Sequence, residues 1–273
     1  MDDGLIEGGN LSGTLPTPLS LPSDISIQDG VLRITGSDGG DEITLTENEN
    51  DLVIVSGGVE SIIPRADVSS YLFRAGDGDD LFENRSSISG TVLGGNGDDI
   101  LIGGSGIDLI RGENGNDRID GGSGDDNILG GEGDDIIFGE EGNDVIRGNG
   151  GEDTLDGGIG NDVIDGGTDN DELFGGSGDD IIVGDLGDDD LFGEDGNDSL
   201  RGGAGDDLIR GGLGDDTLNG DEGRDEVFGD AGIDRIRGGE GEDRLYVDLS
   251  DLLLDTDDDE VIETGLEVAP ELM

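Results

Sequence analysis

A nine-residue repeat is the feature that most constrains this chain. It occupies residues 94–246 and recurs 17 times without insertion or deletion, from GGNGDDILI to GGEGEDRLY. With the positions of a unit numbered one to nine, position one is always Gly, position six always Asp, and position eight always Ile, Leu or Val. Position four is Gly in 16 of the 17 units. A fixed period of this length predicts a stack of equivalent units rather than an ordinary globular domain.

Each fixed position has a structural interpretation. Gly at positions one and four permits positive φ, so positions one to six are expected to form a sharp turn. Positions seven to nine are expected to form a very short strand, and its middle residue points into a core because side chains alternate along a strand. Units that stack in one direction require a parallel sheet, which places Asp above Asp and aliphatic above aliphatic.

The pattern G-G-x-G-x-D-x-aliphatic-x resembles the calcium-binding nonapeptide of the repeats-in-toxin (RTX) proteins. The resemblance implies an all-β fold, a right-handed parallel β-roll or β-solenoid with two units per turn. It also implies that calcium ions lie between turns, bound by position-six carboxylates and by backbone carbonyls of the glycine turns, with units two apart sharing one ion. The metal ligands implied in this way are Asp99, Asp108, Asp117, Asp126, Asp135, Asp144, Asp153, Asp162, Asp171, Asp180, Asp189, Asp198, Asp207, Asp216, Asp225, Asp234 and Asp243.

Charge and core size independently favour a bound cation. Two units per turn would stack every second Asp at about 4.8 Å, where carboxylates repel one another. A hard divalent cation with six or more oxygen ligands would reverse that repulsion. The repeats carry 44 acidic and 9 basic residues, and the 15 pairs of units two apart could take up to 15 calcium ions, which would nearly neutralise them. Because each unit buries only one aliphatic side chain, we expect the repeats to be unfolded without calcium and folded with it.

Four residues depart from the consensus of the repeat. Asp169 replaces the position-four Gly and predicts a distorted turn over residues 166–171. Ile107, Arg224 and Ile233 replace the usual polar residue at position five, and Arg224 places a positive charge beside the next aspartate. Weaker metal sites are expected near these four residues.

The remainder of the chain divides into three segments. Residues 1–24 contain three prolines and are expected to be a flexible leader or linker, or a gene-model remnant. Residues 25–93 alternate apolar and polar residues and predict a β-rich N-terminal cap with two degenerate repeats, Gly36–Thr44 and Ala75–Glu83; a carbohydrate-binding domain is the alternative. Residues 247–273 predict a C-terminal cap and an acidic tail, which by analogy with RTX proteins could hold a secretion signal.

Composition narrows the classes of function. The net charge of −58 argues against nucleic acid and anionic membranes as partners, and no apolar run is long enough to span a membrane. The first residues lack the apolar region of a standard secretory signal peptide. Lys, His and Cys are absent, so no histidine-based triad, thiol or Schiff-base chemistry is available. No active site is predicted, and we interpret the chain as a non-enzyme.

The outward-facing position nine separates two kinds of side chain. If odd and even units lie on opposite faces, all the aromatic residues at position nine fall on one face and most of the Arg residues there fall on the other. The aromatic residues could form cross-strand stacks that stiffen a sheet, or a surface for self-association or for contact with a glycan or protein. They are Phe138, Phe174, Phe192, Phe228 and Tyr246.

These observations predict a secreted, extracellular calcium-binding β-roll protein with a structural or adhesive role. By analogy with the RTX family it would leave the cell by type I secretion and fold on meeting extracellular calcium. The alternative is a calcium-binding accessory module of a secreted RTX enzyme or toxin, such as a protease, lipase, mannuronan epimerase or haemolysin, with its catalytic part elsewhere. An enzyme within this chain would need residues 25–93 to carry the chemistry.

Overall fold

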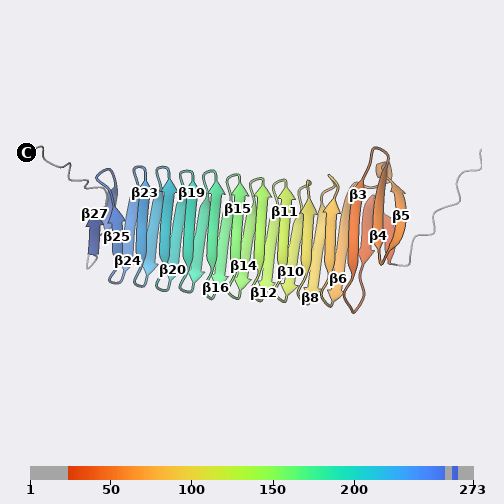
Figure 1. Cartoon of the computed structure of the whole chain (residues 1–273), viewed down its shortest axis with the longest axis horizontal. Helices are drawn as coiled ribbons and strands as arrows, with labels where there is room; N and C mark the ends of the chain where they lie inside the picture. The colour runs from red at the N-terminus through yellow and green to blue at the C-terminus, as the bar shows by residue number, and fades with distance from the viewer. Residues whose placement is uncertain (1–23, 256–259, 264–273) are drawn as a thin grey trace, which may run out of the picture.

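Two long parallel sheets dominate the computed structural model, which describes residues 24–255 and 260–263 (Figure 1). One sheet has 13 strands and runs from β1 (Ile25–Gln28) to β26 (Leu252–Asp255), and the other has 14 strands and runs from β27 (Glu260–Glu263) to β5 (Val59–Pro64). From β6 (Ser70–Asp77) onward, successive strands alternate between the two sheets. Each strand of the repeats therefore pairs in parallel with the strand two further along the chain. The expected all-β parallel solenoid with two units per turn is confirmed.

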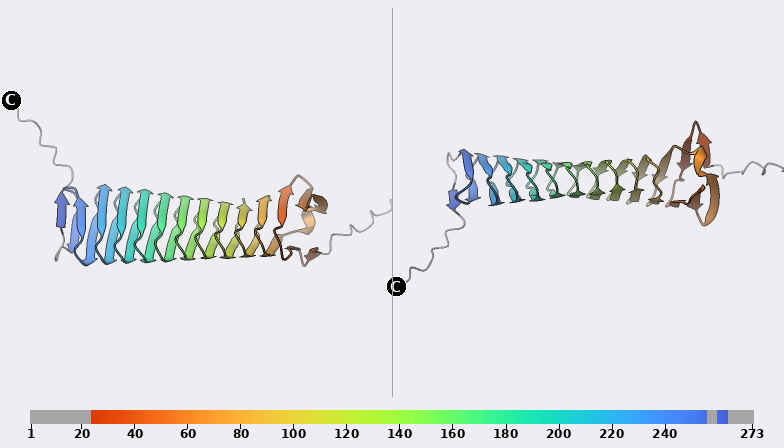
Figure 2. Two further views of the ribbon diagram at one scale, coloured as in Figure 1. Left: turned by 60° about the horizontal axis from the view of Figure 1, so that its bottom comes forward. Right: turned by 90° about the horizontal axis from the view of Figure 1, so that it is seen from above.

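The strands of the repeats are longer than predicted. Most cover six residues, from position seven of one unit to position three of the next, rather than positions seven to nine alone. Figure 2 shows the two sheets running along the whole rod. These strands are β9 Ile100–Gly104, β10 Leu109–Asn114, β11 Arg118–Ser123, β12 Asn127–Glu132, β13 Ile136–Glu141, β14 Val145–Gly150, β15 Thr154–Ile159, β16 Val163–Thr168, β17 Glu172–Ser177, β18 Ile181–Leu186, β19 Asp190–Asp195, β20 Ser199–Ala204, β21 Leu208–Leu213, β22 Thr217–Glu222, β23 Glu226–Ala231, β24 Arg235–Glu240 and β25 Arg244–Val247.

The predicted role of the position-one glycine was wrong. Positive φ occurs at position two, as in Gly95 (119°) and Glu113 (83°), and at most position-four residues, as in Gly97 (128°), but not at position one. The position-one glycine is needed for space instead. A Cβ on Gly148 would lie 2.1 Å from Asp153 Oδ2 and 2.7 Å from the carbonyl oxygen of Gly166. No side chain can enter that gap without displacing the carboxylate or the neighbouring backbone.

The interior of the repeats is a single column of aliphatic side chains. Every position-eight residue is buried, with an exposed fraction of 1% or less, as for Ile146 and Leu200. The same hydrophobic core continues from Ile25 at one end of the described chain to Val247 at the other. The prediction that position eight points inward is confirmed.

The segment before the repeats shares both sheets and the core with them. Here β2, β6 and β8 continue one sheet in parallel, and β3 and β7 continue the other. Strand β1 and the pair β4–β5 are antiparallel and lie at the outer edges, and the predicted leader falls outside the described residues except for Asp24. The elements are β1 Ile25–Gln28, β2 Val31–Thr35, β3 Glu42–Glu47, β4 Asp51–Ser56, β5 Val59–Pro64, the 3₁₀ helix η1 Arg65–Asp67, β6 Ser70–Asp77, β7 Leu81–Arg85 and β8 Gly90–Asn96.

Two more parallel strands extend the roll after the repeats. Strand β26 (Leu252–Asp255) pairs with β24, and β27 (Glu260–Glu263) pairs with β25. The rest of the predicted acidic tail, residues 256–259 and 264–273, lies outside the described residues. Within the described ranges, no helix has the length and apolar character needed to cross a bilayer.

The packing around glycine gives a direct test. We expect Gly148→Ala to destabilise the folded rod by about 1–3 kcal/mol, because its Cβ would overlap the Asp153 carboxylate. Gly150→Ala, two residues away in the same strand, is the matched control, since its nearest new contact would be 3.5 Å from Thr168 Oγ1. Thermal unfolding followed by circular dichroism measures both. Equal stability of the two variants would contradict the steric explanation.

Candidate metal centre

The position-six aspartates form two buried columns. Each residue follows a turn directly and precedes a strand, and its exposed fraction is 2% or less. The odd column contains Asp99, Asp117, Asp135, Asp153, Asp171, Asp189, Asp207, Asp225 and Asp243. The even column contains Asp108, Asp126, Asp144, Asp162, Asp180, Asp198, Asp216 and Asp234.

Backbone hydrogen bonds connect the members of each column. In all but the last two aspartates, Asp234 and Asp243, the amide N–H donates to Oδ1 of the aspartate 18 residues further on, as in Asp153 to Asp171 at 2.8 Å. All 15 such bonds measure 2.7 to 3.0 Å. One carboxylate oxygen of each accepting aspartate is therefore committed to holding the preceding turn.

The second oxygen of each carboxylate has no hydrogen-bond partner. In all 17 position-six aspartates, Oδ2 is buried and accepts no hydrogen bond from the protein. An ionised oxygen in that situation is strongly destabilising, because burial removes its hydration without replacing it. Seventeen such oxygens in one rod favour binding of a positively charged group along the columns.

The unpartnered oxygens lie beside backbone carbonyls. The space where a Cβ of Gly112 would lie is 2.0 Å from Asp117 Oδ2 and 2.7 Å from the carbonyl oxygen of Gly130. The same arrangement recurs at Gly184, with Asp189 Oδ2 at 2.3 Å and a carbonyl oxygen at 2.6 Å. Carboxylate and carbonyl oxygens converging in this way are the ligands that Ca²⁺ prefers.

The carboxylates alone cannot complete a coordination sphere. Among residues 24–255 and 260–263, no three acidic, His or Cys side chains gather closely enough to hold a metal ion. An ion at these columns would therefore take only one or two carboxylates, and backbone carbonyls or water would supply the remaining ligands. The donor set fits a hard divalent cation, and the position-six aspartates with the glycine carbonyls are the groups that would hold it.

Burial changes the acidity of these carboxyls. Burial raises the pKa of Asp126 to about 8; the amide of Asp108 opposes this shift, and the carboxylates of Asp108 and Asp144 add to it. Burial likewise raises the pKa of Asp171 to about 8 and that of Asp99 to about 7. At neutral pH, a metal-free column therefore either takes up protons or carries destabilising charge.

The structure adds a residue that the sequence analysis did not include among the ligands. Asp80, in the degenerate unit Ala75–Glu83, is 3% exposed, donates its N–H to Asp99 Oδ1 at 2.8 Å, and leaves its Oδ2 unpartnered. It extends the odd column by one step. The signal was present, because this unit retains Gly76, Gly78 and Asp80 at positions two, four and six.

Carboxylates with protein donors on Oδ2 mark the ends of the columns. Asp41 precedes Asp80 and donates its N–H to Asp80 Oδ1, and Asp41 Oδ2 accepts from the Ser37 amide at 2.6 Å. At the other end, Asp251 accepts from Asp234 through Oδ1 and from the Asp248 amide through Oδ2 at 2.6 Å. One end of each column, the N-terminal end of the odd column and the C-terminal end of the even column, is therefore closed by a carboxylate whose Oδ2 has a protein donor.

Position five forms a second ladder that the sequence analysis did not predict. Its side-chain oxygen accepts the amide of the position-five residue 18 residues later, as in Asn116 N–H to Asp98 Oδ1 at 2.9 Å. In most units position five is Asp or Asn, which was the available signal. This ladder is exposed, and its amides point toward the preceding turn, whereas the position-six amides point toward the following one.

The four departures leave the aspartate columns continuous. Asp169 takes a positive φ of 77°, and Asp171 in the same turn still accepts from Asp153 and donates to Asp189. Arg224 pairs with Asp206 of the preceding turn at 2.5 Å rather than with Asp225. The amides of Ile107 and Ile233 donate to side-chain oxygens of earlier turns.

The aromatic residues of position nine stack along one sheet. Phe174 and Phe192 have ring centroids 5.0 Å apart, and Phe228 and Tyr246 have centroids 4.1 Å apart. The Arg118 guanidinium lies 4.8 Å from the centre of the Phe138 ring. All five rings are half-buried, and the two stacked pairs are as expected for cross-strand stacking that stiffens the sheet.

The raised pKa values predict how pH affects the metal-free chain. A carboxyl whose folded pKa exceeds its unfolded value near 4 stabilises the fold below that value and loses this contribution as pH rises through the folded pKa. For Asp99, Asp126 and Asp171 that loss occurs around pH 7 to 8. We therefore expect circular dichroism of the metal-free chain to show more sheet at pH 5 than at pH 8.

High salt is the control for this measurement. Salt screens repulsion between exposed charges but affects buried carboxyls much less, so the pH dependence should persist in concentrated KCl. A metal-free chain with the same sheet content at pH 5 and pH 8 would contradict the assigned burial of the columns.

The comparisons agree with this geometry. The family model of the RTX calcium-binding nonapeptide repeat matches residues 93–128, 129–164, 156–191, 183–218, 192–227 and 219–251. No curated protein matches the chain. The matched region covers more than half of the chain and contains both aspartate columns as defined above. The chain belongs to the family of RTX calcium-binding nonapeptide repeat proteins.

Proposed function

We propose that this chain is a calcium-dependent structural rod that folds outside the cell. Calcium binding follows from membership of the repeat family. The observation that carries the proposal is the set of buried, unpartnered Oδ2 atoms, because they make the folded rod unfavourable until a cation is bound. Extracellular calcium, much more concentrated than cytosolic calcium, would then act as the folding signal.

The role proposed for the rod is non-enzymatic, structural or adhesive. The chain has no His, Cys or Lys, and the repeated turns offer the same donor set many times rather than one distinct site. A series of equivalent sites suits cooperative folding better than catalysis. Secretion is part of the proposal. A chain that folds only with calcium would stay unfolded inside the cell and fold once it is outside, where calcium is concentrated.

A calcium titration tests the proposal. We expect the metal-free chain at pH 7.5 to lack most of its sheet signal in circular dichroism and to gain it cooperatively on adding calcium, with a midpoint on the order of 10⁻⁴–10⁻³ M. A chelator should reverse the change. Magnesium at the same concentration is the control, because it dehydrates reluctantly and demands a stricter geometry. Full sheet content and an unchanged melting temperature after metal removal would refute the proposal.

Two substitutions in one turn distinguish the effect of a column carboxylate on calcium binding from the effect of net negative charge alone. Asp135→Asn removes a buried charge and keeps an oxygen for the Asp117 amide, whereas Asp134→Asn removes an exposed charge one residue earlier. We expect Asp135→Asn to weaken calcium binding and raise the calcium midpoint of folding several-fold, and Asp134→Asn to leave it nearly unchanged. Isothermal titration calorimetry measures both, and equal effects would argue that only net charge matters.

A further inference from the structure

We propose that residues 24–93 form a folding nucleus that is stable without a metal ion and from which the repeats extend when calcium binds. The inference rests on the proposed calcium dependence of the repeats. Taken alone, this segment is a sandwich of two four-stranded sheets, β1-β2-β6-β8 and β5-β4-β3-β7. Sheets of three or more strands that share a hydrophobic face can be stable independently.

The segment has a denser core than the repeats. It supplies 15 of the 33 buried hydrophobic residues from only 70 residues, whereas residues 94–247 supply the other 18. Three of its side chains are aromatic: Phe73 stacks on Phe82 at 4.6 Å between ring centroids, and Tyr71 lies 5.5 Å from the same ring. More apolar area is therefore buried per ordered residue here than in the repeats.

The segment contains two local hairpins with tight turns. Strands β1 and β2 are joined by Asp29 and Gly30, with φ of 54° and 81°, and β4 and β5 by Gly57 and Gly58, with φ of 54° and 77°. Two-residue turns with positive φ at both positions match the twist of antiparallel strands and favour hairpins. Residues 94–247 contain no such hairpin, because each repeat strand pairs in parallel with strands about 18 residues away. The longer pairings of the segment, β2 with β6 and β3 with β7, join residues 39 apart, so the two hairpins are the local contacts that can form first.

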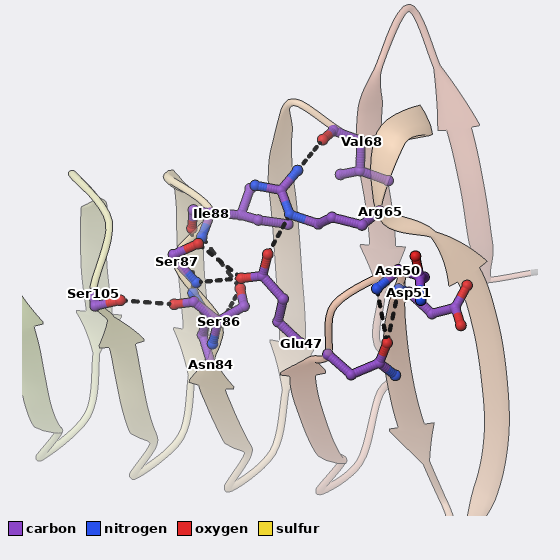
Figure 3. Close-up of polar contacts among 11 residues, drawn as sticks. Glu47, Asn50, Asp51, Arg65, Val68, Asn84, Ser86, Ser87, Ile88 and Ser105 are labelled. Atoms are coloured by element: carbon purple, nitrogen blue, oxygen red, sulfur yellow. Dashed lines mark hydrogen bonds and ion pairs between the residues drawn. The ribbon is translucent and has the colours of Figure 1, made fainter.

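Protein hydrogen bonds satisfy the partly exposed carboxylate of Glu47, at the end of β3 (Figure 3). Glu47 accepts from Arg65 Nε at 2.6 Å and from the amide and hydroxyl of Ser87 at 2.9 and 2.8 Å. Arg65 also donates to the carbonyl of Val68 at 2.7 Å. This carboxylate has the donors that the position-six aspartates lack. Within residues 24–93, Asp80 is the only carboxylate left with a buried, unpartnered oxygen.

Neutral donors also complete the junction with the repeats. Asn84 accepts the amide of Ser86 at 2.8 Å through Oδ1, and donates through Nδ2 to the carbonyl of Gly103. Tyr71 donates its hydroxyl to Asp108 Oδ1 at 3.0 Å. Asp108, the first aspartate of the even column, therefore accepts a hydrogen bond from the Tyr71 hydroxyl of the N-terminal segment. Later aspartates of the column, such as Asp126, accept at Oδ1 from the amide of the preceding aspartate instead.

This junction offers a template for the repeats. Strand β8 pairs with β10 and β7 pairs with β9, so both sheets of the segment present an edge to the first two repeat strands. If those edges exist before calcium arrives, the first turns need only add to them, without forming a new nucleus. Folding of the repeats then proceeds from the N-terminal end toward the C-terminal end.

Hydrogen exchange of the full chain tests the nucleus. With a chelator, we expect amides in residues 25–92 to exchange at least about 100-fold more slowly than unstructured amides, and those in residues 100–245 at nearly unstructured rates. With calcium, both regions should be protected. Rapid exchange of residues 25–92 in the chelator, with calcium protecting everything together, overturns the nucleus and leaves the proposed function intact. Full protection of the repeats in the chelator overturns both.

Matched core variants sharpen the test. Phe73→Ala should reduce chelator-state protection of residues 25–92 by about tenfold or more and raise the calcium midpoint of the repeats. Ile209→Ala, equally buried but within the repeats, should leave that protection unchanged. Equal protection of residues 25–92 in these two variants contradicts the proposal.

A third variant covers the case in which Phe73→Ala fails to fold. Tyr71→Phe keeps the ring in the core and removes only the hydroxyl that contacts Asp108. We expect chelator-state protection of residues 25–92 to persist and the calcium midpoint of the repeats to rise several-fold. An unchanged midpoint would show that the junction does not template the repeats, and would overturn that part of the proposal.

Discussion

The burial of carboxylate oxygens without a hydrogen-bond partner is the constraint on which the rest of the rod depends. Each position-six aspartate uses Oδ1 to hold the amide of the preceding turn, and this bond fixes the carboxyl inside the stack. The second oxygen is thereby buried with no donor. The interaction that aligns the turns therefore also creates a need for positive charge.

The glycines follow from the same constraint. At position one, the Asp carboxylate and a carbonyl of the neighbouring turn fill the space that a side chain would need, so only Gly fits. At position two, positive φ is required, but Glu113, Asn149 and Asp221 accept it. This explains why position one is invariant in the repeats while position two varies. Because no side chain stands at position one, the backbone of the neighbouring turn packs closely around the carboxylate. Its carbonyl oxygen then lies near enough to Oδ2 for both oxygens to bind one cation.

The rod is energetically uneven along its length. The repeats bury one aliphatic residue in nine and stack charged turns, whereas residues 24–93 bury aromatic residues and satisfy Glu47 with protein donors. Stability that comes from a hydrophobic core is independent of the metal, and stability that comes from screened carboxylates is not. A molecule built from both kinds of segment can respond to calcium over most of its length and still retain a defined starting point.

The sequence by itself determined the periodic part of this protein. The period of nine, the invariant Asp and the single aliphatic position predicted a parallel two-sheet solenoid, the inward column at position eight and the alignment of Asp with Asp. These follow from side-chain alternation and from the stacking of identical units, which need no knowledge of distant contacts.

Only the tertiary structure decided the rest, because each remaining feature depends on atoms of neighbouring turns. Whether the position-one Gly is needed for φ or for space depends on where Asp153 Oδ2 and the Gly166 carbonyl lie. That Asp80 joins the odd column and Tyr71 holds the first turn of the even column depends on strand pairing across irregular loops of the N-terminal segment. The degenerate unit marks Asp80 as a repeat aspartate, but Asp80 lies 19 residues before Asp99, so only the fold shows that it joins the column. No repeat relates Tyr71 to Asp108, and that contact cannot be predicted from the local sequence.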